Sequence, residues 1–174
     1  GQIIKTYPAH RAWIRDLAFS PDGQILASSS HDFSVKLWAM PDGQCLHTFY
    51  HRDEAGRLAW SPDSTQFASV GFDQTLRIWH ASTGQCLQVL RGKAPQLESV
   101  AWSPDGQYLA CPGGDHTILL WEARTGECLK AFTDHRDLVW YVAFSPDGQT
   151  LASSSQDCTI KLWDVATGRC RQTI

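Results

Sequence analysis

The chain has 174 residues, of which 43% are hydrophobic and 19% are charged, and its formal net charge is −3. This composition is that of an ordinary globular protein, and its Lys and Arg residues are scattered rather than gathered in the basic stripe that nucleic-acid binding needs. The sequence contains no run of 18 apolar residues and no charged-then-apolar leader, so we expect a cytoplasmic protein that does not cross a membrane.

The first seven residues, G-Q-I-I-K-T-Y, open the chain in the middle of a pattern. The same stretch, a turn glycine followed by alternating residues, returns at Gly43–Phe49, Gly84–Leu90, Gly126–Phe132 and Gly168–Ile174. Such a stretch is typical of a short strand. We therefore expect residues 1–9 to be the outer strand of a preceding unit, and the chain to be a piece of a longer protein or a processed product.

Four repeats follow, over approximately residues 10–50, 51–92, 93–134 and 135–174. Each contains a polar link, an apolar run, a Ser-Pro-Asp turn, a second strand, a tight turn at an Asp, a third strand that ends at a Trp, and a fourth strand. The Trp residues are spaced 41, 42 and 42 residues apart, at Trp38, Trp79, Trp121 and Trp163. Self-similarity with a period of about 40–45 residues is typical of a repeat architecture.

The repeat pattern predicts an all-β fold. No segment shows helical periodicity, and connections this short permit only antiparallel, up-and-down pairing. A lone four-stranded sheet with apolar residues on both faces cannot bury them, whereas sheets stacked radially against one another can. We predict four four-stranded antiparallel blades, which form a propeller segment spanning residues 1–174.

The motifs S-P-D-G, L-A-S-S-S-Q-D and K-L-W-D (Lys161–Asp164), with a His 28 residues before the Trp, resemble those of WD-repeat β-propellers. The resemblance covers the whole chain, although the Trp-Asp dipeptide itself occurs only at Trp163-Asp164. Rings of this family are shaped for about seven blades. Four blades are therefore expected to be part of a larger propeller, completed by further blades of the same protein, or of an eight-bladed ring closed by a second copy of the chain.

Four of the six Cys residues also recur with the repeat, at Cys45, Cys86, Cys128 and Cys170. Neighbouring packed sheets lie about 10 Å apart, whereas a disulfide requires Cα atoms within about 7 Å. We therefore expect reduced, half-buried packing residues. No C-x-x-C pair occurs, and we predict no metal site and no cofactor.

His, Ser and Asp recur together and could be mistaken for a hydrolase triad. Because an active site is needed only once, their repetition argues against catalysis and against an enzyme. The resemblance implies instead a buried hydrogen-bond network that links the indole N–H to Ser, His and Asp. Its members are His10, Ser28, Asp32, Trp38, His51, Ser69, Asp73, Trp79, Asp115, Trp121, His135, Ser153, Asp157 and Trp163.

The third repeat departs from this set. Lys93 stands at the His position and Cys111 at the Ser position, and Pro112 follows, which cannot donate to a ladder. Two interpretations remain open: sequence drift in a tolerant repeat, or a loosened blade that contacts a ligand or a neighbouring domain.

In propellers of this kind, function lies in the loops that cluster on one face. The resemblance implies that partners contact the third and fifth residues after the His and the residue before the turn Asp. These positions are Trp13, Arg15, His31, Glu54, Phe72, Gln96, Glu98, Leu138, Trp140 and Gln156. Exposed Trp, Phe and Arg anchor protein interfaces, although large aromatic residues also pack beneath loops.

The predicted function is a non-catalytic scaffold or sensor that binds a protein or peptide on the loop face. The texture of the repeats is similar to that of WD-repeat arrays attached to signalling ATPases, so we expect a larger regulatory protein, by analogy alone. The alternative is binding of a small ligand or nucleic acid through the channel face, and a steep salt dependence would indicate nucleic acid.

Overall fold

The computed structural model describes residues 2–3, 5–92 and 97–174. The first sheet contains β1 (Ile14–Phe19), β2 (Ile25–Ser30), β3 (Ser34–Ala39) and β4 (Gln44–Tyr50). The second contains β5 (Ala55–Trp60), β6 (Gln66–Gly71), β7 (Thr75–His80) and β8 (Cys86–Arg91). The third contains β9 (Ala101–Trp102), β10 (Tyr108–Pro112), β11 (Ile118–Glu122) and β12 (Cys128–Phe132). The fourth contains β13 (Val139–Phe144), β14 (Thr150–Ser155), β15 (Ile160–Asp164) and β16 (Cys170–Thr173).

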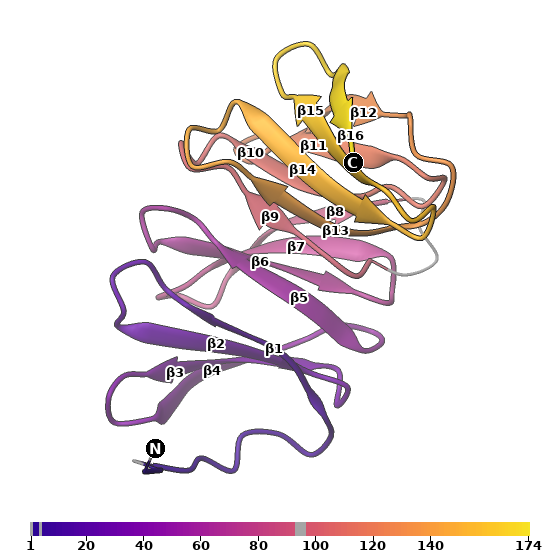
Figure 1. Ribbon diagram of the computed structural model, residues 1–174. Coiled ribbons are helices and arrows are strands. Elements are labelled where there is room, and N and C mark those ends of the chain that lie inside the picture. The colour runs from indigo at the N-terminus through magenta and orange to yellow at the C-terminus, as the bar shows by residue number, and fades with distance from the viewer. Residues whose placement is uncertain (1, 4, 93–96) are drawn as a thin grey trace.

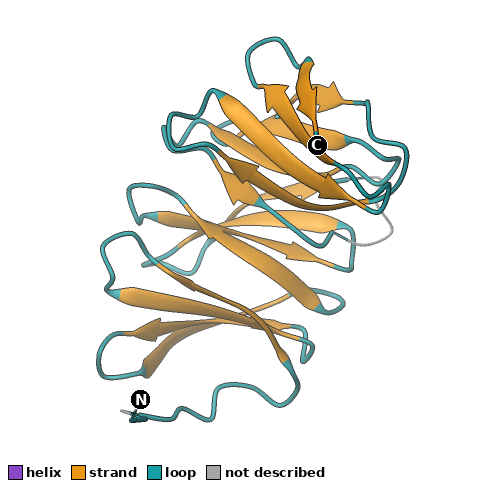
Figure 2. Ribbon diagram, in the orientation of Figure 1, coloured by secondary structure: helices purple, strands orange, loops and turns teal. Residues whose placement is uncertain are grey.

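Every sheet has the same topology. Its four strands are antiparallel neighbours in the order of the sequence, and the described residues form strands and loops without a helix (Figure 2). The four sheets follow one another along the molecule from the indigo to the yellow end of the chain (Figure 1). The predicted all-β fold of four-stranded antiparallel blades is therefore confirmed, and we call the four sheets blades 1 to 4.

The hydrophobic core lies between the blades rather than within any one of them. One cluster joins blade 1 to blade 2 and includes Val35 and Phe67. A second joins blades 2 and 3, and a third joins blades 3 and 4 around Trp163. Because each sheet carries apolar side chains on both faces, stacking is the arrangement that removes them from water.

The first strand of each blade lies innermost, and these strands run side by side around a common hub. β1 packs against β5, β5 against β9, and β9 against β13. Contacts also reach across the hub: Arg15 of blade 1 pairs with Glu98 of blade 3, and the Arg57 guanidinium of blade 2 lies 5.0 Å from the Tyr141 ring centroid of blade 4. Contacts between blades two apart are possible because the row of inner strands is curved.

The N-terminal segment differs from the predicted strand. Its described residues, 2–3 and 5–9, have no strand conformation, whereas Gly1 and Ile4 lie outside the described residues. An outer strand pairs only with the third strand of its own blade, and no described strand lies beside this segment to serve as that partner. The Lys5 Nζ donates to the Asp42 carbonyl over 2.7 Å, and the Tyr7 hydroxyl to the Pro41 carbonyl over 2.9 Å. The assignment to a preceding blade stays a prediction.

The repeated cysteines are free thiols, but three of them are more exposed than the sequence indicated. Cys45, Cys86 and Cys128 are exposed and Cys170 is partly buried. Each stands at the start of an outer strand, where the register shifts against the Trp of the third strand. The outer strand lies at the edge of its sheet, so its first side chain reaches solvent.

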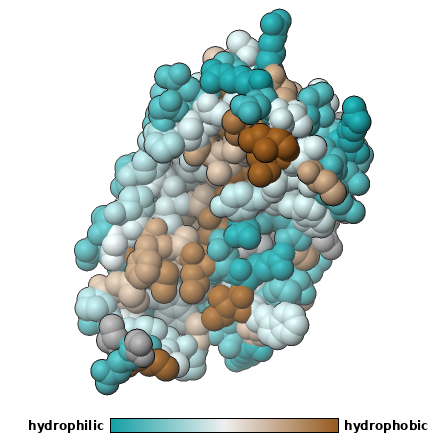
Figure 3. All heavy atoms as spheres, viewed as in Figure 1, coloured by the Kyte–Doolittle hydropathy of each residue, from teal (hydrophilic) through white to brown (hydrophobic). Residues whose placement is uncertain are grey.

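The two end blades expose apolar positions that are buried at every internal junction. Leu58 of blade 2 is 7% exposed against blade 1, whereas the equivalent Leu17 of blade 1 is 57% exposed. Figure 3 shows apolar side chains gathered over blade 1 and again over blade 4. The difference between the exposed fractions of Leu17 and Leu58 therefore shows how much apolar surface a neighbouring blade removes from water.

We expect Leu58→Ala to lower the free energy of unfolding by about 2–5 kcal/mol, because the truncation leaves a cavity at a closed junction. The matched change Leu17→Ala should lower it by less than about 1 kcal/mol, as at a surface position. Denaturant titration of both variants measures the two losses. Equal losses would show that blade packing is not the source of the stability.

Candidate functional site

In three of the repeats, the Trp, Ser, His and Asp side chains form a continuous hydrogen-bonded chain. In blade 2, Trp79 Nε1 donates to Ser69 Oγ over 2.9 Å, and Ser69 Oγ lies 2.8 Å from His51 Nε2. His51 Nδ1 lies 3.3 Å from Asp73 Oδ1, and Asp73 also accepts the Arg52 backbone N–H over 2.9 Å. Because the Asp73 carboxylate can only accept, the neutral imidazole carries its hydrogen on Nδ1 and donates it there, and the unprotonated Nε2 accepts the Ser69 hydroxyl hydrogen.

The same geometry recurs in blades 1 and 4. The distances are 2.8 Å for Trp38–Ser28, 2.7 Å for Ser28–His10, 3.1 Å for His10–Asp32, 2.8 Å for Trp163–Ser153, 2.7 Å for Ser153–His135 and 2.8 Å for His135–Asp157. The imidazoles have no exposed surface. A serine sealed beneath a buried imidazole offers a substrate no approach, so the arrangement supports the structural role and not a triad.

The network controls the ionisation of its own members. Burial alone would raise the pKa of Asp73, but hydrogen bonds from His51, the Thr75 hydroxyl and the Arg52 N–H outweigh it and hold that pKa well below its ordinary value. The pKa values of Asp32 and Asp157 are lowered in the same way. Burial lowers the pKa of His10, and the Asp32 carboxylate opposes that shift only in part.

In the third repeat, a weak contact from Trp121 to Cys111 stands in place of the Trp–Ser hydrogen bond of this chain. Trp121 Nε1 donates to Cys111 Sγ over 3.4 Å, and sulfur is a weak acceptor. Burial raises the pKa of Cys111 to about 12. The Thr117 hydroxyl donates to Asp115 Oδ1 over 2.7 Å, whereas Lys93, at the position of the network His, lies outside the described residues.

We define the loop face as the end of the molecule that carries the links before each first strand and the tight turns at the Asp positions. On this face, the candidate contact residues form two clusters. In the first cluster, Trp13 is 81% exposed, and its ring centroid lies 5.9 Å from that of His31. His31 Nδ1 lies 3.2 Å from Glu54 Oε2. The His31 N–H donates to the Trp13 carbonyl over 3.0 Å, so the exposed indole stands on a fixed backbone.

The second cluster lies at the hub and joins three blades. Arg15 pairs with Glu98, and its guanidinium lies 5.9 Å from the centroid of the Phe72 ring. The Glu98 side chain is only 14% exposed, whereas that of Arg15 is 38% exposed. A guanidinium held between a carboxylate and an aromatic face is fixed in position while its remaining edge stays accessible.

The candidate residues of blade 4 stand apart from these two clusters. Trp140 is 44% exposed, Leu138 is partly buried and Gln156 is exposed. The Gln156 N–H donates to the Leu138 carbonyl over 2.8 Å. Gln96 lies outside the described residues. The structure therefore brings together six of the ten candidate positions, and their role in binding stays a prediction.

Arg57 and Tyr141 are part of the same hub surface, although the sequence analysis did not single them out. Arg57 Nη1 lies 3.9 Å from Asp16 Oδ1, and its guanidinium faces Tyr141. With Asp16 and Ser99, these residues occupy one repeated position on the inner strands. The available signal was the variation of residue type at that position, from Asp to Arg, Ser and Tyr.

The described part of the chain comprises residues 2–3, 5–92 and 97–174. In that part of the chain, no group of three His, Cys, Asp or Glu side chains is placed to hold a metal ion. No helix there has the length and apolar character needed to cross a membrane.

Comparisons with known proteins agree with the architecture. A family model described as the IFT122 first beta-propeller matches residues 1–174. The chain is 39% identical over 54 residues to WD repeat-containing protein 36 of Homo sapiens, which is 31% of this chain and 6% of that protein. It is 43% identical over 49 residues to Nuclear distribution protein PAC1 of Tuber melanosporum, covering 28% and 11% of the two chains. It is 46% identical over 44 residues to WD repeat-containing protein 18 of Mus musculus, covering 25% and 10%. The matched segments therefore span at most 11% of the length of these relatives.

Stability should fall in two steps as the pH is lowered. Since the pKa of His10 is lowered from 6.5, the unfolded state takes up a proton first, and stability declines below about pH 6.5. The stabilisation from Asp32 and Asp73 is complete above their unfolded value of 3.8 and is lost below it. Denaturant titrations at about pH 8, 5.5 and 3 measure the steps. Asp73→Asn should shrink the lower step and spare the upper one, and an unchanged lower step would contradict this assignment.

The cysteines should divide sharply in their reaction with iodoacetamide. Cys45, Cys128 and Cys158 are exposed and should be alkylated in the native protein. Cys111 should remain unmodified until the protein is unfolded, because the thiolate is the reactive form and burial disfavours it. Peptide mapping by mass spectrometry checks both outcomes. Native alkylation of Cys111 at the rate of Cys45 would show that blade 3 opens readily.

Proposed function

The chain belongs to the IFT122 first beta-propeller family of WD-repeat proteins, and we propose that it is a non-catalytic platform that binds a protein or peptide on its loop face. Propellers of this family are in general protein-interaction modules, and typically non-catalytic ones. The finer proposal is that this chain is the scaffolding or sensing part of a larger regulatory protein with a signalling role in the cytoplasm.

The observation that carries the proposal is the exposure of Trp13 on a fixed frame. Its indole is 81% exposed, yet its backbone carbonyl is held by His31 and the preceding link is held by the network, since the Arg11 N–H donates to Asp32 over 2.9 Å. A rigid exposed aromatic side chain loses little conformational entropy when a partner covers it. Tryptophan is also among the residues enriched at interface hot spots.

The charges around the hub favour a protein partner over nucleic acid. Arg15 is paired with Glu98, and Arg57 lies beside Asp16. Carboxylates therefore compensate both guanidinium groups, and the chain as a whole has a net charge of −3. A phosphate backbone requires an uncompensated positive surface, whereas protein interfaces combine aromatic anchors with paired charges.

The apolar faces of the end blades supply a second part of the proposal, which concerns further blades. Leu17 and Phe19 of blade 1 are 57% and 59% exposed. On blade 4, Ile160 and Ile174 are exposed, although they occupy the positions that Val35 and Phe49 bury against blade 2. The two faces are thus the two halves of the junction that occurs between adjacent blades within the chain. We propose that further blades, of the same protein or of a second copy, cover them.

The function is tested by substituting the exposed aromatic residues of the loop face. Trp13→Ala and Trp140→Ala should each change the free energy of unfolding by less than about 1 kcal/mol, because their side chains make few buried contacts. Binding of a loop-face partner should weaken at least tenfold, or about 1.4 kcal/mol. The measurement is quantitative capture of cellular proteins on the immobilised chain, combined with thermal denaturation of each variant.

Arg169→Ala is the control for this experiment, because Arg169 is exposed on the turn at the opposite end of blade 4. It should leave capture unchanged. If the tryptophan variants keep every captured protein, or lose several kcal/mol of stability, the loop face is not the binding surface.

A further inference from the structure

Two adjacent cavities lie on the turn face, which is the end of the molecule opposite the loop face. Antiparallel pairing places the Ser-Pro-Asp turns and the turns before each fourth strand there. One cavity, of about 250 Å³, lies between blades 2 and 3. The other, of about 470 Å³, lies between blades 3 and 4. Asp105 lines both, so the two cavities are adjacent and share a wall, and we call the pair the groove.

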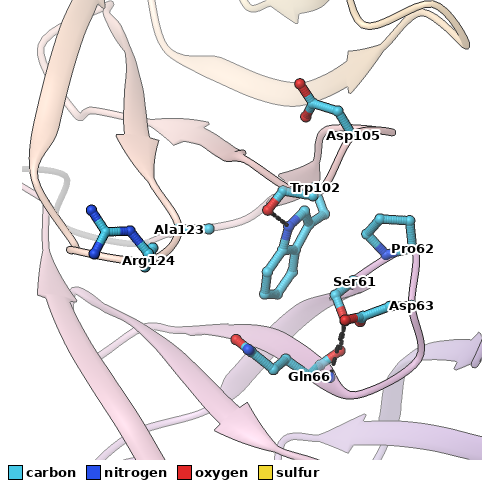
Figure 4. A pocket seen from close by; sticks show the side chains of 9 residues that line it. Ser61, Pro62, Asp63, Gln66, Trp102, Asp105, Ala123 and Arg124 are labelled. Carbon is cyan, nitrogen blue, oxygen red and sulfur yellow. Dashed lines mark hydrogen bonds between the residues drawn. The ribbon is translucent and has the colours of Figure 1, made fainter.

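The first cavity lies beside Trp102, whose indole is oriented differently from that of the equivalent Trp60. Trp60, at the junction of blades 1 and 2, donates its Nε1–H across the junction to the Ala18 carbonyl over 2.9 Å and is 8% exposed. The equivalent Trp102 donates instead to the Gly106 carbonyl of its own turn over 3.1 Å and is only partly buried. In Figure 4 its ring stands between Pro62 on one side and the segment carrying Arg124 on the other. The ring thus forms an aromatic wall of the cavity.

Hydrogen-bond donors without partners line this cavity beside the aromatic wall. Within the described part of the chain, the Arg124 guanidinium forms no ion pair or hydrogen bond, and neither does the Gln66 carboxamide. Two carboxylates, Asp63 and Asp105, also line this cavity, and each accepts a hydrogen bond within its own turn, from Ser61 over 2.6 Å and from Ser103 over 2.5 Å. A guanidinium and an amide that are both free to donate recognise a carboxylate.

The second cavity has a different lining. Tyr108, Leu120 and Leu129 form its apolar side, and polar and charged residues of blade 4 form the other: Asp147, Gln149, Asp164 and Arg171. Arg171 pairs with Asp164, and the Lys130 ammonium is engaged by the Val165 and Ala166 carbonyls. Tyr108 occupies the repeat position that Gln66 holds in the first cavity. The carboxamide of Gln66 in the first cavity is thus replaced by the phenol ring of Tyr108 in the second. The apolar side of the second cavity fits a large apolar side chain.

The shared wall has hydrogen-bonding capacity of its own. The Ser103 hydroxyl and the Gln107 N–H both donate to Asp105 Oδ1, over 2.5 Å and 3.0 Å. Its other oxygen, Oδ2, receives no hydrogen bond from the described residues. A backbone N–H that passes over the wall between the two cavities can donate to this atom.

We propose that this groove binds an extended peptide segment that places an acidic side chain in the first cavity and a large apolar side chain in the second. In an extended strand, residues two or four apart project to the same side. Cavities one blade apart are separated by about 10 Å, between the reach of these two spacings, so the two side chains are those of residues two or four apart. The acidic group pairs with Arg124 and Gln66 above the Trp102 ring, and the intervening backbone N–H donates to Asp105. The groove is separate from the loop face and its binding does not depend on the function proposed there.

The test is a positional-scanning array of immobilised peptides, probed with the full chain, in which two positions of a Gly-Ser frame, two or four residues apart, run through all side chains. We expect enrichment of Glu or Asp at one position and of Leu, Phe or Met at the other. In solution, Arg124→Gln should weaken binding of the best peptide at least tenfold and abolish the preference for Glu over Gln. Leu129→Ser should abolish the apolar preference and keep the acidic one.

Two control variants separate this groove from the loop face. Arg52→Gln removes one exposed arginine from the loop face, and Trp13→Ala removes its most exposed aromatic residue; both should bind the best peptide as the unmodified chain does. The proposal is overturned if no peptide is enriched, if the Arg124 and Leu129 variants retain both preferences, or if Trp13→Ala abolishes binding. A thermal melt of each variant shows whether a loss of binding is a loss of folding.

Discussion

The rest of the structure depends on the burial of apolar side chains between neighbouring sheets. Each blade has two apolar faces and too little interior to cover either, so its stability depends on the blades that it packs against. Burial contributes roughly 25 cal/mol for each Å² of apolar surface removed from water. A residue such as Leu58, closed off by the adjacent blade, therefore belongs to a junction rather than to its own sheet. The faces of the sheets are therefore occupied by packing, whereas the loops and turns at the two ends of each sheet stay accessible to partners.

The hydrogen-bonded networks determine how the free loop ends are held. Each network joins a buried indole to the link that enters the same blade, through contacts such as Arg52 N–H to Asp73. A satisfied buried network is rigid, because breaking any one bond leaves a polar group unpaired in the interior. The loop face is thus preorganised, and the exposed Trp13 and the paired Arg15 are presented without a large ordering cost on binding.

The sequence predicted the features that repeat, and missed the features that depend on how the repeats curve. Spacing alone predicted the strands and their antiparallel order, and the resemblance implied the network geometry. The contact of Arg15 with Glu98 was not foreseen, because it joins blades two apart and arises only when the inner strands close around a hub. The exposure of Cys45 was missed for a related reason. Periodicity identifies equivalent positions, but burial is decided by whether a neighbouring strand or blade is present.

Equivalent positions also make each repeat a reference for the others, and blade 3 departs from that reference at both ends. Near the loop face, a contact from Trp121 to Cys111 replaces the Ser-centred network. At the turn face, Trp102 donates its indole hydrogen bond to Gly106 of its own turn, whereas the equivalent Trp60 donates across the junction to Ala18. In an architecture where the apolar core is divided into separate junctions between neighbouring blades, such changes cost stability mainly at the junction that carries them. The junction between blades 2 and 3 can therefore open a cavity while the junction between blades 1 and 2, with Trp60 in place, stays closed.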